Sequence, residues 1–186
     1  SHSIRPQAVD EAAFLLSTVW PYFPPDTVHL VVVDPGVGGR RRAVILETRN
    51  AIFVAPDYGV LSYVVQASKG RPISRSGRTG LPPDLEAFQI TNRQFWRQPV
   101  SPAFHGRDIF APVAAHISLG KPLTQLGKPI ASLWATKALA QRTAQAAAAV
   151  VQERARRPAG RREAVHADQL AARLDRRRGA PGRARH

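Results

Sequence analysis

Residues 28–42 read Val28-His29-Leu30-Val31-Val32-Val33-Asp34-Pro35-Gly36-Val37-Gly38-Gly39-Arg40-Arg41-Arg42. The apolar run from Leu30 to Val33 predicts a strand that is buried on both faces of a sheet, because β-branched side chains suit a pleated, covered surface. Pro35 ends that strand, since proline has no N–H for the sheet ladder. In open α/β sheets, side chains just past the carboxyl end of a strand line the ligand crevice. The aspartate, glycines and arginines of this segment therefore mark the first candidate site.

The surrounding sequence alternates helical and strand patterns. Apolar residues at helical spacing predict helices over residues 9–20, 60–67 and 109–118, the last capped by Gly120. Short apolar runs predict strands over residues 43–46, 52–55 and 85–91, with a turn at Arg49-Asn50 between the first two. Residues 68–84 are polar and rich in Gly and Pro, which predicts a long loop. We therefore expect an α/β domain over residues 1–134, in which a mostly parallel sheet is sandwiched between helices.

The net charge of +14 is unevenly distributed along the chain. Residues 137–186 hold 13 Lys/Arg against 4 Asp/Glu, whereas residues 1–136 hold 14 against 9. Residues 135–186 are rich in Ala and Arg and offer few large apolar side chains, which predicts a disordered or irregularly helical basic tail and not a folded domain. Such a tail would bind nucleic acid only non-specifically, through its phosphates. Out-of-frame translation of a GC-rich gene would produce a similar composition.

Composition excludes several classes of protein and site. The chain has no cysteine, so it has neither a disulfide framework nor a thiolate metal site. No apolar run approaches the roughly 20 residues of a membrane span, so we expect no membrane association and a cytoplasmic location. The glycines at 36, 38 and 39 match neither phosphate-binding fingerprint. A Walker loop needs Gly-Lys-Ser/Thr, and the dinucleotide motif needs a glycine where Arg41 stands.

Three residues are candidates for chemistry, and each also has a purely structural explanation. Asp34 and Arg41 could form an ion pair that only ties their loop together. His105 on its own could be a surface histidine or a satisfied core histidine. It lies, however, in a glycine-containing loop just before a predicted helix, whose N-terminus would favour a neutral imidazole. Asp108 could simply cap that helix.

Several segments in order resemble one family. They are Ser1-His2-Ser3-Ile4 with Pro6-Gln7, the segment from Val28 to Gly38 with Arg41-Arg42, Phe53-Val54-Ala55-Pro56-Asp57, and Phe104-His105-Gly106-Arg107-Asp108-Ile109-Phe110-Ala111-Pro112. Together they resemble the S-adenosyl-L-methionine (SAM) hydroxide adenosyltransferases, SAM hydrolases related to the SAM-dependent chlorinase and fluorinase. The resemblance covers residues 1–134.

The resemblance implies that water or hydroxide attacks C5′ of SAM to give adenosine and L-methionine, with no metal or redox cofactor. It places a catalytic triad on Asp34, Arg41 and His105, and substrate contacts on Gln7, Val37, Phe104 and Gly106. Asp34 and a neutral His105 could accept protons from the water, and Arg41 could stabilise hydroxide. The halogenating relatives carry tyrosine in place of this aspartate and lack this histidine, so the resemblance favours a hydrolase.

Members of the family normally have a further strand before the first matching segment and a β-barrel domain after the last. We therefore expect the chain to be incomplete at both ends, and to be a homotrimer if complete. Three functions stay open: an active SAM hydrolase, an inactive fragment of one, or a basic nucleic-acid-binding protein that acts through its Arg-rich tail.

Overall fold

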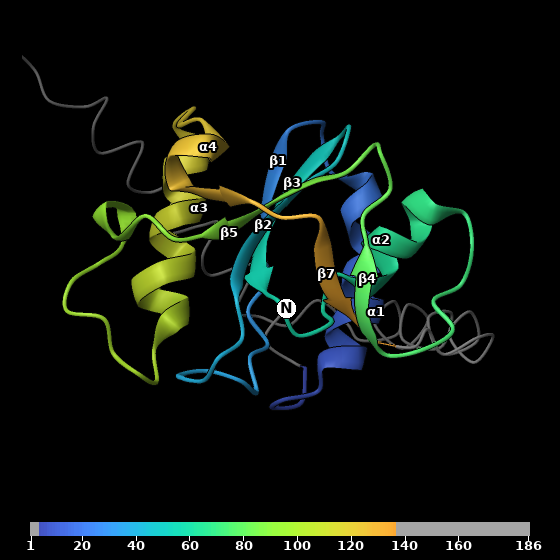
Figure 1. Ribbon diagram of the computed structural model, residues 1–186, viewed down its shortest axis with the longest axis horizontal. Coiled ribbons are helices and arrows are strands. Elements are labelled where there is room, and N and C mark those ends of the chain that lie inside the picture. The colour runs from blue at the N-terminus through green and yellow to red at the C-terminus, as the bar shows by residue number, and fades with distance from the viewer. Residues whose placement is uncertain (1–3, 137–186) are drawn as a thin grey trace, which may run out of the picture. The chain divides into compact units, whose positions relative to one another are not determined.

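A computed structural model describes residues 4–136 as two β-sheets with helices packed around them (Figure 1). The tail was predicted over residues 135–186; of these, Ala135 ends the strand β7 (Ser132–Ala135), and residues 137–186 lie outside the described residues. The helices are α1 (Val9–Val19), α2 (Ser62–Lys69), α3 (Ala111–Ser118) and α4 (Leu123–Leu126). The strands are β1 (Thr27–Leu30), β2 (Ala43–Glu47), β3 (Ala51–Pro56), β4 (Gly77–Gly80), β5 (Glu86–Ile90), β6 (Gly127–Pro129) and β7 (Ser132–Ala135). Short 3₁₀ turns cover Trp20–Tyr22 and Arg93–Phe95, and a π-helical segment, Gly106–Phe110, runs into α3. Among these helices, none is long and apolar enough to cross a membrane.

The main sheet is mixed, so the prediction of a mostly parallel sheet was wrong. Its strand order is β1-β3-β2-β5-β6, and only β1 and β3 run parallel. The reason is the tight turn between β2 and β3, where the Thr48 N–H donates to the Ala51 carbonyl at 2.9 Å. Two strands joined by so short a turn must be antiparallel, because a parallel pair needs a crossover connection of about a dozen residues or more.

The strand β1 is also not the doubly buried strand that its apolar run predicted. It lies at the edge of the main sheet and covers Thr27–Leu30, and the chain from Val31 onward no longer forms regular strand. Leu30 is 46% exposed and Val32 is 40% exposed. The Val31 N–H still donates to the Val54 carbonyl at 3.0 Å, which keeps the start of the segment 31–42 attached to β3.

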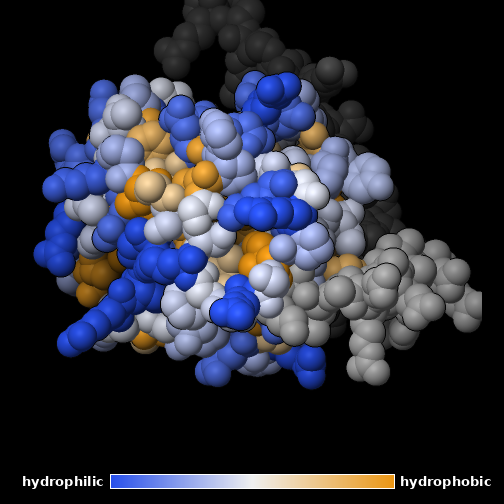
Figure 2. All heavy atoms as spheres, turned by 45° about the vertical axis from the view of Figure 1, so that its right-hand side comes forward, coloured by the Kyte–Doolittle hydropathy of each residue, from blue (hydrophilic) through white to orange (hydrophobic). Residues whose placement is uncertain are grey.

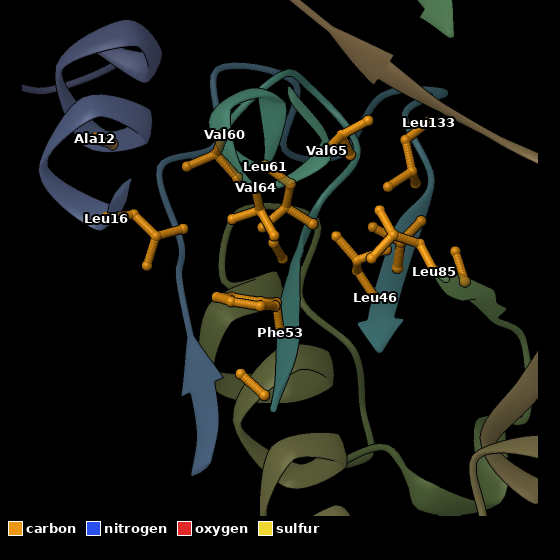
Figure 3. Packing of buried hydrophobic residues seen from close by; sticks show 14 of the residues in the cluster. Ala12, Leu16, Leu46, Phe53, Val60, Leu61, Val64, Val65, Leu85 and Leu133 are labelled. Atoms are coloured by element: carbon orange, nitrogen blue, oxygen red, sulfur yellow. The ribbon is translucent and has the colours of Figure 1, made fainter. Parts of the chain in front are cut away.

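Helices cover both faces of the main sheet, as the sequence predicted. Side chains of β2 alternate between the faces, so that Val44 and Leu46 join one hydrophobic cluster while Ala43 and Ile45 join the other. The first cluster packs against α1 and α2, and Figure 3 shows Leu16, Phe53, Val60 and Val64 pointing into it. The second cluster packs against α3 and the π-helical segment before it. Helices therefore cover each of the two faces of the main sheet.

The segment predicted as a long loop, residues 68–84, contains the strand β4. It pairs antiparallel with β7 to form a separate two-stranded sheet, with Arg78 opposite Trp134. The pairing partner lies far away in the sequence, so no local pattern indicated this strand.

On the face seen in Figure 2, polar side chains cover most of the surface, and hydrophobic side chains are exposed in small patches.

Candidate active site

Two loops from distant parts of the sequence meet beside the edge of the main sheet. One is the loop after β1, residues 31–42, and the other precedes the π-helical segment, residues 101–105. Gly38 has a φ of +75°, and a Cβ atom built on it would lie 2.7 Å from the Pro102 carbonyl oxygen. Only glycine tolerates both that backbone conformation and that approach. The contact therefore depends on the glycine-rich sequence between Asp34 and Arg40.

The meeting of these loops joins Asp34, Arg41 and His105 in one hydrogen-bonded set. Arg41 Nε donates to the two carboxylate oxygens of Asp34 at 2.9 and 3.0 Å, and Arg41 Nη2 also donates to Oδ2. The same Nη2 lies 2.8 Å from Nδ1 of His105. The side chains of Arg41 and Asp34 are only 6% and 7% exposed. The structure thus brings the three predicted residues together, while their catalytic roles stay a prediction.

The contact with Arg41 determines the tautomer of His105. A guanidinium has only donors, so Nδ1 of His105 must be the acceptor, and a neutral imidazole then carries its proton on Nε2. Burial is the largest cause that lowers the pKa of His105, and the positive charge of Arg41 lowers it further. Asp34 and Asp108 act in the opposite direction, but the net shift is downward. His105 is therefore neutral at pH 7 and presents an N–H donor at Nε2.

Arg41 also contacts the Phe110 ring and Gly36. Its guanidinium carbon lies 5.0 Å from the centre of the Phe110 ring, a cation–π distance. Its Cγ atom lies so close to Gly36 that a Cβ built there would be only 2.9 Å away. These contacts fix the guanidinium that joins Asp34 to His105.

The residues predicted to bind substrate are found in two places. Val37 and Phe104 lie in the two loops that meet at the triad. Gly106 is the first residue of the π-helical segment that follows the second loop. Val37 is 38% exposed and Phe104 is 58% exposed, so apolar surface lies next to the charged set. Gln7 is exposed in the turn before α1, with a φ of +62°. Apolar surface beside a few convergent polar groups is typical of a ligand site.

Asp108 does not cap a helix, contrary to that structural explanation. Its buried carboxylate accepts the Ser101 N–H at 2.9 Å and the guanidinium of Arg107 at 2.7 and 3.0 Å. The Asp108 carbonyl accepts the Arg97 N–H at 2.8 Å. The residue therefore ties residues 97, 101 and 107 together around the loop that carries His105. The hydrogen bond from Arg107 is the largest cause that lowers the pKa of Asp108 to about 2.

This depressed pKa predicts acid sensitivity of the loop. A carboxyl group whose pKa is lower in the folded state stabilises the fold above its unfolded pKa, here 3.8, and that stabilisation is lost as the pH falls toward about 2. We expect the unfolding midpoint in urea to fall between pH 4 and pH 2 more steeply for the wild type than for Asp108→Asn. An equal slope for the two proteins would contradict the role given to this carboxylate.

A second ionic cluster, around the buried carboxylate of Asp57, was not predicted from the sequence. Asp57 follows β3, and its side chain is 1% exposed. It accepts Arg42 Nε at 2.8 Å, Arg78 Nη1 at 3.0 Å and the Trp134 N–H at 2.6 Å. The cluster fastens the small sheet to the end of the main one. Only the pairing of β4 with β7 brings Arg78 and Trp134 to Asp57, so the sequence carried no signal for it.

Within residues 4–136, no three His, Cys, Asp or Glu side chains are grouped so that they could hold a metal ion.

Comparison with known proteins confirms the family resemblance. Residues 1–127 match the family described as the SAM hydroxide adenosyltransferase N-terminal domain. The chain is 40% identical over 130 residues to an (R)-S-adenosyl-L-methionine hydrolase of Salinispora tropica, a match that covers 70% of this chain and 44% of the relative. It is 35% identical over 118 residues to the hydrolase of that name from Methanocaldococcus jannaschii, covering 63% and 38%.

A more distant relative and a solved structure also match this chain. A fluorinase of an Actinoplanes species is 23% identical over 153 residues, covering 70% of this chain and 47% of that enzyme. The crystal structure of an uncharacterized conserved protein from Thermotoga maritima superposes with a TM-score of 0.64 at 40% identity, covering 74% of this chain and 48% of that one. The chain thus spans less than half the length of these relatives.

Proposed function

Because the chain belongs to the SAM hydroxide adenosyltransferase family, we propose that it hydrolyses SAM to adenosine and L-methionine. The observation that supports this most is the continuous set of hydrogen bonds from Asp34 through Arg41 to His105, with apolar side chains beside it. A carboxylate, a guanidinium and a neutral imidazole in contact can orient and deprotonate a water molecule.

Departure of the leaving group in SAM hydrolysis needs little assistance from the protein. Water attacks C5′, the new C5′–O bond forms as the C5′–S bond breaks, and the bonding electron pair stays on sulfur. The positively charged sulfonium therefore leaves as a neutral thioether, and no general acid is needed. The protein must instead hold the nucleophile in line with C5′ and remove its solvent.

The observed hydrogen bonds suggest how the three residues divide this work. Nδ1 of His105 is occupied by Arg41, so the proton from water would pass to the Asp34 carboxylate, which has more acceptor sites than Arg41 uses. Arg41 would stabilise the developing hydroxide, and the Nε2–H of His105 would donate to it. This assignment replaces the sequence-based idea that a neutral His105 accepts a proton.

Hydrolysis is favoured over halogenation on two grounds. A carboxylate at position 34 repels a halide ion, whereas it attracts the protons of water. The similarity to the named hydrolases, 40% and 35%, also exceeds the 23% to the fluorinase.

We expect the full chain to release adenosine and methionine from SAM in equal amounts. In water enriched with ¹⁸O, mass spectrometry should find the label in the 5′-hydroxyl of adenosine, because the nucleophile is solvent. Asp34→Asn should lower the rate about 10²-fold or more, since it removes the proton acceptor. Asp26→Asn is the matched control, because Asp26 is exposed in the turn before β1.

Other products would overturn the proposal. A 5′-halogenated adenosine formed in the presence of chloride or fluoride would show a halogenase. An absence of adenosine from the wild type would show that this chain alone does not hydrolyse SAM. Equal rates for Asp34→Asn and wild type would exclude the triad.

A further inference from the structure

Tyr58 lies in the turn between β3 and α2, and its ring packs against the loop that carries Asp34 and Arg41. A Cβ atom built on Gly36 would lie 3.3 Å from Cδ2 and Cε2 of Tyr58 and 2.9 Å from Cγ of Arg41. The Tyr58 ring and the Arg41 stem therefore meet at Gly36. Tyr58 is 43% exposed, so its ring is not part of the hydrophobic core.

Hydrogen bonds of Asp57 and Tyr58 hold the backbone of the turn that carries the Tyr58 ring. The Asp57 N–H donates to the Arg42 carbonyl at 2.9 Å, and the Asp57 carboxylate accepts Arg42 Nε at 2.8 Å. The Tyr58 N–H donates to the Pro56 carbonyl at 2.9 Å. Because Arg42 directly follows Arg41, the turn is tied to the chain right beside the triad.

Apart from the ion pair between Asp34 and Arg41, the loop that the Tyr58 ring contacts has few hydrogen bonds within itself. Two turn hydrogen bonds lie within residues 34–39, from Val37 N–H to the Asp34 carbonyl at 3.3 Å and from Gly39 N–H to the Gly36 carbonyl at 3.0 Å. Three of these six residues are glycines, which contribute no side-chain packing and gain the most conformational freedom when released. The conformation of the loop must therefore depend on what packs against it from outside.

We propose that Tyr58 is a positioning residue, whose ring holds the glycine loop so that Arg41 stays between Asp34 and His105. The ring lies on one side of the loop at Gly36, and the Pro102 carbonyl contacts it at Gly38. Without the ring, Gly36 and the Arg41 stem lose their neighbour, and the guanidinium moves away from Nδ1 of His105. The effect on turnover rests on the proposed hydrolase function, whereas the effect on His105 does not.

The test compares Tyr58→Ala with Tyr58→Phe and with Tyr22→Ala, a control at a tyrosine that is 87% exposed. The titration of His105 is followed by ¹⁵N NMR of its imidazole. Since burial and Arg41 lower the pKa of His105, loosening the loop should raise that pKa in Tyr58→Ala. Tyr58→Phe should keep the wild-type titration, because the ring and not the hydroxyl makes the contact.

Turnover of SAM gives an independent measurement. A displacement of about 1 Å at a catalytic group can cost about 10²-fold in rate, so kcat of Tyr58→Ala should fall about that much with little change in KM. Tyr58→Phe should restore most of it. If the wild type does not hydrolyse SAM, the proposed function fails while the His105 titration still tests the role of Tyr58.

A second variant keeps the test valid if Tyr58→Ala does not fold. Gly36→Ala places a methyl group between the ring and the Arg41 stem, and should also raise the pKa of His105. An unchanged His105 titration in a folded Tyr58→Ala, or in Gly36→Ala where the first variant is unfolded, would overturn the proposal.

Discussion

Replacing Arg41 with glutamine is expected to lower the free energy of unfolding by about 3–5 kcal/mol and to abolish adenosine release. The variant leaves the Asp34 carboxylate, 7% exposed, without its counter-ion, and an uncompensated buried charge carries a cost of this size. It also breaks the contact with His105 at 2.8 Å. Urea unfolding followed by circular dichroism measures the first effect, and adenosine formation measures the second.

Two comparisons make this result specific to the buried pair. Arg5→Gln breaks the exposed pair with Glu11, in which the side chains are 83% and 38% exposed, and should cost about 1 kcal/mol or less. The double variant Asp34→Asn/Arg41→Gln removes both charges and should recover much of the lost stability but none of the activity. A single variant as stable as the wild type would show that the pair contributes nothing to the fold.

Replacing Asp57 with alanine is expected to cost about 3–5 kcal/mol and to release the small sheet. Asp57 is the common acceptor for Arg42, Arg78 and the Trp134 N–H, and its loss leaves the guanidinium groups of Arg42, 18% exposed, and Arg78, 47% exposed, without their shared anion. Amide hydrogen exchange should therefore accelerate in β4 and β7 more than in β2 and β3. The exposed Asp84, changed to asparagine, is the control.

The amide variant separates charge from hydrogen bonding in this cluster. Asp57→Asn can still accept the Trp134 N–H, so it should be more stable than Asp57→Ala by about 1–3 kcal/mol. If exchange in β4 and β7 were unaffected by Asp57→Ala, the small sheet would be held by other contacts.

Local pattern in the sequence was enough for most individual elements. The helices α1, α2 and α3 and the strands β2, β3 and β5 lie within a few residues of their predicted positions. Gly120 closes α3 with a φ of +80°, as expected for a C-terminal cap. These features depend on side-chain period and on glycine conformation, which are properties of a few neighbouring residues.

Patterns of this kind did not show which segments pair. The run Leu30–Val33 carries the same apolar signal whether it is central or at an edge, and β4 has no signal apart from its distant partner β7. Asp34 and Arg41 are near in sequence, and their ion pair was one of the two explanations considered for them. The Asp57 cluster was not anticipated.

By itself, the sequence determined the family, the α/β class, the helices on both sheet faces and the identity of the three candidate catalytic residues. Only the tertiary structure decided the mixed strand directions of the main sheet, the edge position of β1, the tautomer of His105 and the contact of Tyr58 with Gly36. The physical reason is the distance in the sequence between the groups that interact. Periodicity and turn chemistry act over a few residues, whereas strand pairing, proton placement and loop support depend on groups that folding brings together from distant parts of the chain.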